Sequence, residues 1–386
     1  MGGGLMQLVA YGAQDIYLSG NPQITFFKVV YRRHTNFSME AIDQTFNGNA
    51  DFGKKVTCTI SRNGDLIHRV YVQVSLPSLS TDKWVEWVGH KLIKSVEIEI
   101  GGQRIDKHYG DWLHIWNELS QTEGHWAGYK IMVSGADEDD FSGVLSHPGD
   151  DTPVTGAART LFIPLQFWFC RNPGLALPLI ALQYHEVKVN VEFAPANDCR
   201  SGTADPAPSF VSATLYVDYI YLDTDERRRF AQVTHEYLIE QLQFTGDEKA
   251  QSKLKLNFNH PVKELIWVEQ PADAKVGEYV TTYNEAHIQL NGHDRTSARK
   301  APYYQLVQPY QHHERVPTDP KQPINVYSFA LKPEEHQPSG TCNMSRIDNA
   351  TLNLAGVDSN NTVKVFAVNY NVLRIMSGMG GLAYSN

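Results

Sequence analysis

Apolar and polar residues alternate along much of the chain, with the period of two that is typical of β-strands with one buried face. The clearest alternation covers residues 56–61, 70–76, 96–100, 187–193 and 215–221. We expect the first two of these strands to form a β-hairpin, because Asn63-Gly64-Asp65 between them readily adopts positive φ. The pattern therefore predicts an all-β protein.

Two segments have helical spacing instead. The first follows Gly101-Gly102 and places four large residues on one helical face: Tyr109, Trp112, Leu113 and Trp116. In the second, Asp223 can cap free backbone N–H groups at the start of a helix, and Phe230 and Val233 share a face. We expect this second segment, residues 223–236, to be a helix that connects two domains.

The two halves of the chain repeat one order of signals: alternating strand, glycine turn, aromatic segment, polar loop, strand near a proline, and two further strands. The first copy has them at residues 96–102, 109–116, 134–159, 163–169, 187–193 and 214–221. The second copy has them at residues 286–292, 303–310, 316–323, 326–331, 346–354 and 363–368. This order predicts a duplicated domain.

Short strands with turn signals and few helices are typical of antiparallel sandwiches, of which the eight-stranded jelly roll is a common form. A chain of 386 residues also exceeds what one core usually serves. We therefore expect two tandem eight-stranded jelly-roll sandwiches with a short connecting helix. The predicted division is an N-terminal arm (1–24), a first jelly roll (25–222), the connector helix (223–236) and a second jelly roll (237–386).

Composition narrows the class of protein. Hydrophobic residues make up 42% and charged residues 20%, so the chain can form globular cores. Its four cysteines form no C-x-x-C pair, which favours reduced, buried thiols in a protein made in a cytosol. The formal net charge is −9 and the basic runs are short, so we expect no direct binding to nucleic acid.

Candidate chemistry is sparse. His185-Glu186 and His235-Glu236 lack the second histidine of an H-E-x-x-H metal motif, and no G-x-S-x-G is present. We expect His312-His313-Glu314 and the acidic run Asp137 to Asp140 to lie in solvated loops, and Gly378 to Gly381 to be a flexible end. The sequence therefore predicts no catalytic, cofactor-binding or metal-binding residue, no cofactor and no enzyme activity.

Five stretches resemble the major capsid proteins of nucleocytoplasmic large DNA viruses, particularly those of algal viruses. They are QLVAYGAQDIYLSGNPQITFFKVVYRRHTNFSME (7–40), ISRNGDLIHRVYVQVSLP (60–77), DYIYLDTDERRRFAQVTHEYLIEQLQ (218–243), YSFALKPEEHQPSGTCNMSRIDNATL (327–352) and YNVLRIMSGMGGLAYSN (370–386). The resemblance implies a double jelly roll that forms homotrimers, which are pseudo-hexagonal capsomers of an icosahedral shell over an internal membrane.

The resemblance also implies partners: neighbouring capsomers, minor capsid and penton proteins, and the membrane side through the N-terminal arm, after assembly in the host cytoplasm. We expect the acidic loop 134–159 and the Pro- and His-rich loop 293–323 to project outward, with the prolines from Pro309 to Pro323 holding an extended chain. A jelly-roll fold is compatible with two other functions, those of a carbohydrate-binding lectin and of a jelly-roll oxygenase. The chain has neither a secretion signal for the first nor paired histidines on strands for the second.

Overall fold

The computed structural model describes residues 2–134, 156–272, 274–317 and 323–384. Contacts divide the chain into a short N-terminal unit that ends at Asn36 and a large unit that begins at Phe37. The N-terminal unit contains helices α1 (Gly3–Val9) and α2 (Ile16–Ser19), and neither helix buries a residue. All sheets belong to the large unit.

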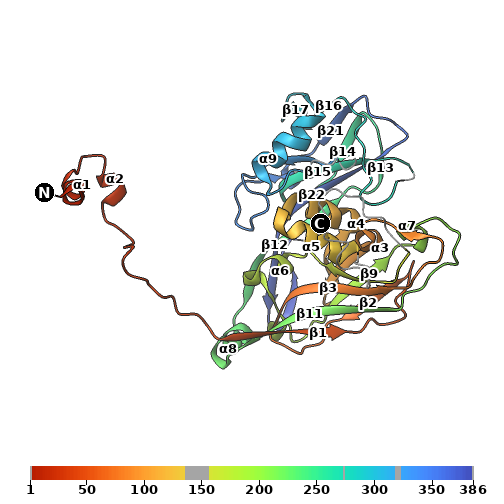
Figure 1. Ribbon diagram of the computed structural model, residues 1–386, viewed down its shortest axis with the longest axis horizontal. Helices are drawn as coiled ribbons and strands as arrows, with labels where there is room; N and C mark the ends of the chain where they lie inside the picture. Colours follow the sequence, from red (N-terminus) through yellow and green to blue (C-terminus); the bar gives the residue numbers. More distant parts are fainter. Residues whose placement is uncertain (1, 135–155, 273, 318–322, 385–386) are drawn as a thin grey trace. The chain divides into compact units, whose positions relative to one another are not determined.

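The first half of the large unit is a sandwich of two antiparallel sheets (Figure 1). One sheet has the order β1 (Phe37–Gln44), β11 (Ser212–Leu222), β3 (Leu66–Leu76), β7 (Arg159–Pro164), and the short strand β8 (Leu177–Pro178) pairs with β3. The other has the order β2 (Lys55–Thr59), β9 (Val187–Phe193), β5 (Ile93–Ile100), β6 (Gln103–Tyr109). Alternate residues of both sheets meet in one apolar core, as the period of two predicts.

The predicted hairpin between residues 56–61 and 70–76 is wrong. Strand β2 pairs with β9 and strand β3 pairs with β11 and β7, so the two segments lie in opposite sheets. Between these two segments the chain crosses from one sheet to the other. Tyr219 holds this crossing in place, because its hydroxyl donates to the carbonyl oxygen of Ser61 at 2.6 Å. A Cβ on Gly64 would lie 2.8 Å from Cβ of Tyr219, so this close crossing explains the glycine better than a hairpin turn does.

The second half repeats this sandwich. One sheet has the order β12 (His235–Phe244), β22 (Thr362–Met376), β15 (Pro261–Gln270), β19 (Asn325–Ser328), with short strands β13 (Glu248–Lys249), β20 (Cys342–Asn343) and β23 (Met379–Leu382) attached. The other has the order β14 (Lys253–Leu256), β21 (Ala350–Ala355), β16 (Glu285–Leu290), β17 (His293–Asp294), and β18 (Arg299–Lys300) pairs with β16.

Strand order confirms the duplication that the sequence predicted. The four matched pairs of strands occupy the same positions in their sheets: β5 with β16, β7 with β19, β9 with β21 and β11 with β22. Each half therefore has two four-stranded sheets of identical topology, extended by short strands. The fold is a double jelly roll, as expected.

Helices lie in the connections between strands. The capped helix predicted near the middle is α8 (Thr224–Gln232), where a side-chain oxygen of Asp223 accepts from the backbone N–H of Glu226 at 3.0 Å. The other helices of the first half are α3 (Val88–Leu92), α4 (Gly110–Ser120), α5 (Glu123–Ser134), α6 (Trp168–Arg171) and α7 (Ala196–Cys199). A short strand pair, β4 (Lys83–Trp84) with β10 (Arg200–Ser201), closes one end. No helix within the described ranges is long and apolar enough to cross a membrane.

The expectation of an extended chain from Pro309 to Pro323 is wrong at its start, which is helical. Residues Tyr303–Val307 form a π-helical turn that continues into α9 (Gln308–His312). Pro309 stands in the first turn of α9, where its missing N–H leaves no helical hydrogen bond unmade. Most of the acidic loop, residues 135–155, lies outside the described residues.

Candidate functional site

Helix α4 lies between the two jelly rolls and is buried on several sides (Figure 1). Its apolar side chains pack on the outer face of the sheet that contains β15, β19 and β22, in a cluster separate from both sandwich cores. The described cluster comprises Trp112, Ile115, Trp116 and Leu119 of α4 with Ile266, Val268, Tyr279, Ile324, Val326, Phe366 and Val368. We call this cluster the joint. At the joint, apolar surfaces of the two jelly rolls are in contact and exclude water.

Charged pairs between the two halves surround the joint. The carboxylate of Asp111 lies 2.6 Å from Nζ of Lys364 and accepts a hydrogen bond from the hydroxyl of Tyr279 at 2.9 Å. Farther along α4, Glu118 lies 3.0 Å from the guanidinium of Arg315. Burial lowers the pKa of Lys364, but the charges and hydrogen bonds of Asp111 and Asp247 together outweigh it and hold that pKa above its usual value. These buried pairs set the orientation of the two halves more than they add stability.

A third set of charges lies where residues 168–175 face the second jelly roll. Glu240 is buried and contacts Arg171 of the first half at 3.2 Å and Lys263 at 2.9 Å. Burial would raise the pKa of Glu240, but Arg171, His336 and Lys263 together lower it to about 2. The carboxylate is therefore ionised at any pH near neutrality.

The chain's last strand also holds the halves together. Gly378 to Gly381, expected to be a flexible end, belongs largely to strand β23, which pairs with β22. The carbonyl oxygen of Gly378 accepts a 3.0 Å hydrogen bond from the N–H of Tyr184 in the first half. A Cβ on Gly380 would lie 2.7 Å from Cδ2 of Leu182, so only glycine allows this close approach. The flexible-end prediction is therefore wrong.

The prediction of a solvated loop at His312-His313-Glu314 is wrong for His313. Its side chain is fully buried, with Nε2 2.9 Å from a carboxylate oxygen of Glu264 and Nδ1 2.7 Å from one of Glu334. Burial lowers the pKa of His313, but the two carboxylates outweigh it and raise that pKa to about 9. His313 is therefore an imidazolium that is paired with two glutamates.

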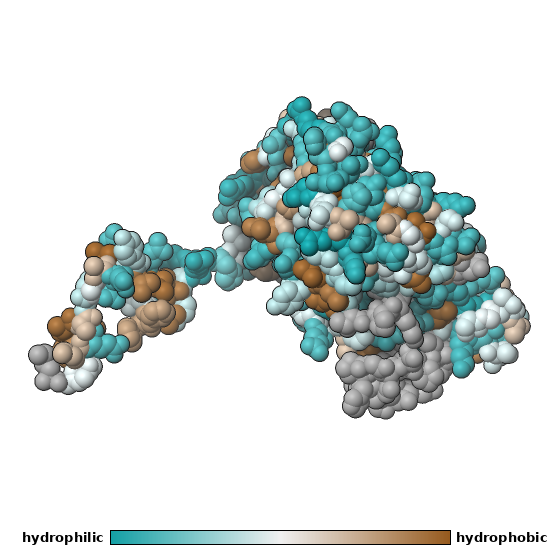
Figure 2. All heavy atoms as spheres, turned by 90° about the horizontal axis from the view of Figure 1, so that it is seen from above, coloured by the Kyte–Doolittle hydropathy of each residue, from teal (hydrophilic) through white to brown (hydrophobic). Residues whose placement is uncertain are grey.

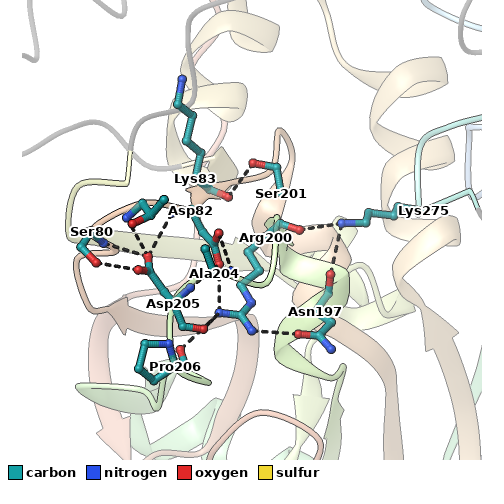
Figure 3. A network of polar contacts seen from close by, with 11 residues as sticks. Ser80, Asp82, Lys83, Asn197, Arg200, Ser201, Ala204, Asp205, Pro206 and Lys275 are labelled. Carbon is teal, nitrogen blue, oxygen red and sulfur yellow. Dashed lines mark hydrogen bonds and ion pairs between the residues drawn. The ribbon is translucent and has the colours of Figure 1, made fainter.

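A polar network fastens two loops at the end of the first jelly roll (Figure 3). The carboxylate of Asp205 accepts from the backbone N–H groups of Ser80, Thr81 and Asp82 at 2.9 to 3.0 Å, and also from the hydroxyl of Ser80. These hydrogen bonds, of which that of the Ser80 hydroxyl has the largest effect, hold the pKa of Asp205 well below its usual range. Arg200 lies 3.1 Å from Asp82 and donates to the carbonyl oxygen of Asp205 at 2.7 Å.

Lys275 of the second half joins the same network. Its Nζ donates to the carbonyl oxygens of Arg200 at 2.7 Å and Asn197 at 3.1 Å (Figure 3). The network therefore links the two halves at the end of the first jelly roll.

The N-terminal unit presents a different surface. Figure 2 shows hydrophobic side chains gathered along it, and the most exposed are Tyr17, Leu18, Phe26, Phe27 and Tyr31, each at least 87% accessible. No acidic residue occurs between Asp15 and Glu40, whereas Lys28, Arg32 and Arg33 fall in this stretch. Such a segment needs a partner to cover it.

Among the described residues, no group of three or more His, Cys, Asp or Glu side chains is arranged to hold a metal ion. His185 binds the backbone of Gly380, and His235 contacts the carbonyl oxygen of Phe230 at 2.7 Å. Cys58, Cys170 and Cys199 are buried free thiols, as expected, and burial raises the pKa of each.

Sequence reasoning placed Trp112 and Trp116 on a helix but missed the contacts that this helix makes between the two halves. The signal that could have found them is the composition of α4, whose apolar residues are not confined to one face: Trp112, Leu113, Ile115, Trp116 and Leu119. A helix that is apolar nearly all round is buried by more than one neighbour. The charged partners in the second half, such as Lys364 and Arg315, had no comparable signal because they lie some 200 residues away.

Comparisons with known proteins agree along the whole chain. The family described as "Major capsid protein N-terminus" matches residues 25–223, and the one described as "Large eukaryotic DNA virus major capsid protein" matches residues 226–381. The major capsid protein of Pyramimonas orientalis virus is 70% identical with full coverage of both chains, and that of Paramecium bursaria Chlorella virus 1 is 43% identical with full coverage.

Solved structures give the same picture. A PBCV-1 virus capsid structure is similar with a TM-score of 0.80 and 40% identity, over 94% of this chain and 100% of that one. The Faustovirus major capsid protein has a TM-score of 0.73 at 15% identity, over 95% and 94% of the two chains, a similarity of fold alone.

Truncating Trp112 tests the joint. The variant Trp112→Ala should lower the free energy of unfolding by about 3 to 5 kcal/mol, because it opens a cavity among fully buried residues. Chemical denaturation of the purified protein measures this change. The control Tyr310→Ala removes a side chain that is 78% exposed and should change stability by less than about 0.5 kcal/mol. A loss below about 1 kcal/mol for Trp112→Ala would mean that the joint is not a packed core.

His313 makes stability depend on pH. Because its folded pKa, about 9, lies above the usual 6.5, its stabilising effect is complete below pH 6.5 and is lost as pH rises through 9. The full effect is on the order of 3 kcal/mol. Unfolding free energies of the wild type and His313→Gln should therefore differ most near pH 6 and converge toward pH 10. A difference that stays constant from pH 6 to pH 10 would show that His313 is not charged in the folded protein.

Proposed function

Because the chain belongs to the major capsid proteins of large eukaryotic DNA viruses, we propose that it forms homotrimers that tile the outer shell of the icosahedral capsid as pseudo-hexagonal capsomers. The family is one of structural proteins and not of enzymes. The observation that carries the proposal is the pair of topologically identical sandwiches held by a buried joint.

Symmetry connects this observation to a tile. A closed ring of three chains repeats each sandwich three times, and two sandwiches of one topology in each chain give six similar units around the axis. The units keep equal positions only if the two sandwiches of one chain cannot move against each other. The joint, the charged pairs around it and the contact of Lys275 with Arg200 supply that restraint.

We further propose that the N-terminal arm faces the inside of the shell. Its exposed apolar side chains support this, because they call for burial against neighbouring subunits, minor capsid or penton proteins, or the membrane side. Assembly in the host cytoplasm fits the buried free thiols.

The proposed domain division keeps the arm at 1–24, the jelly rolls at 25–222 and 237–386, and the connector at 223–236. The boundary at residue 222 is supported by the last strand of the first sandwich, which ends at Leu222, whereas β12 already begins at His235, inside the proposed connector. The alternative function, a carbohydrate-binding lectin, finds no support among the relatives, which are named capsid proteins.

The oligomeric state tests the trimer. Purified protein at micromolar concentration should have a mass of about 130 kDa by light scattering, which corresponds to three chains of 43.5 kDa. A protein that stays at the mass of one chain under native conditions would contradict the proposal.

Deletion of residues 2–20 tests the arm. Neither helix of this segment buries a residue, so the truncated protein should keep the unfolding free energy of the full chain while shell assembly fails. Denaturation measures the first quantity, and electron microscopy of particles measures the second. Normal particles from the truncated protein would refute an assembly role for the arm.

A further inference from the structure

The outer face of the sheet formed by β14, β21, β16 and β17 contains a hollow of about 570 Å³. Its lining comprises Lys253, Lys255, Gln289, Asn291, Gly292, Asn349 and Thr351, so two ammonium groups, three amides and a hydroxyl converge without a carboxylate. The strand register places Lys255, Thr351 and Gln289 in one row across three strands. The hollow therefore lies on the sheet and extends to the turn at Asn291-Gly292 and to Asn349, just before β21.

Polar atoms at this face lack partners. Thr351 is 9% exposed, and its hydroxyl makes no hydrogen bond within the described chain; nor does the buried side-chain nitrogen of Asn353, in the adjacent row. Neither Lys253 nor Lys255 forms an ion pair with any carboxylate of the described residues. Asp294, the nearest acidic residue in the register, accepts from the amide of Gln289 at 3.1 Å. A buried hydroxyl and two free cations at one place favour an anionic, hydrogen-bonding ligand.

The duplicated fold supplies an internal comparison. On the matching face of the first jelly roll, Glu97 lies 3.4 Å from Lys55 and 2.9 Å from Lys107, so the lysines are neutralised. Glu99 accepts a hydrogen bond from the amide of Asn190 at 3.2 Å. These charged and polar groups on the outer face of the first copy therefore have partners within that copy.

The second copy has different residues at the corresponding strand. Strand β5 of the first copy directs Glu97 and Glu99 outward, whereas its counterpart β16 directs His287 and Gln289 outward at the middle of the sheet. By strand register, Lys253 and Lys255 of the second copy stand where the first copy has Thr57 and Thr59. The second copy thus gains two lysines on this face and lacks the two glutamates. This difference cannot come from the requirements of the fold, because both copies have the same topology.

We propose that this hollow binds an acidic polysaccharide, with Lys253 and Lys255 on a sulfate or carboxylate group and the amides and Thr351 on sugar hydroxyls. A volume of this size holds about two sugar units within the usual range of ligand sites. No aromatic residue lines the hollow, so it offers no surface on which nucleic acid bases could stack. It also offers no apolar pocket of the kind that anchors a peptide side chain.

The test compares dextran sulfate with neutral dextran of the same length on the purified, oligomeric protein, by biolayer interferometry at physiological salt. Dextran sulfate should bind and neutral dextran should not. The double variant K253Q/K255Q should weaken binding at least tenfold, since two charge-assisted contacts are lost. The variant Thr351→Val should weaken it about threefold while the dependence on salt stays that of the wild type.

The matched control is K55Q/K107Q, which removes the same charge from the corresponding face of the first jelly roll and should change affinity less than twofold. Unfolding curves of all variants establish that each is folded. Equal losses in the two double variants would reduce the effect to overall charge and overturn the site. Equal binding of neutral dextran, or no binding of dextran sulfate by the wild type, would overturn it as well.

Discussion

The large unit depends on the burial of one helix against both sandwiches. Helix α4 continues directly from strand β6 of the first jelly roll, and its tryptophans pack on a sheet of the second. A sheet with two apolar faces would be insoluble alone, so the second jelly roll requires α4 to cover its outer face. The first jelly roll in turn requires an apolar surface on which the side chains of α4 can pack. The charged pairs of Asp111 and Glu118 then select one relative orientation among those that burial alone would permit.

The alternation of residues was enough to predict the strands, their inward faces and the duplication, because the two-residue period reports directly on burial. It could not predict pairing. Residues 56–61 and 70–76 satisfy a hairpin and a crossing between sheets equally well, and the contact of Gly64 with Tyr219, more than 150 residues away, decides between them. Long-range partners also explain the two other failures. His313 is buried because Glu264 and Glu334 neutralise it, and Gly380 is ordered because Leu182 lies against it.

Two copies of one fold have been free to differ in their surfaces while they share a core pattern. In the first copy, the outer face beside β5 is neutralised by its own glutamates. In the second, the corresponding face is open and cationic, and an imidazolium is buried elsewhere in the same half. Identical topology therefore coexists with different arrangements of charge on the two outer faces.

The core of the first sandwich contains Leu373 and Ile375, which belong to strand β22 near the end of the chain. The backbone N–H of Tyr184 likewise has its hydrogen-bond acceptor, the carbonyl oxygen of Gly378, only after residue 378 has been synthesised. During synthesis, the first sandwich emerges from the ribosome about 10 to 30 s before these residues do, at common elongation rates. Until then its apolar edge stays open to water, so the newly made half is a substrate for chaperones, and native folding is coupled to the completion of translation.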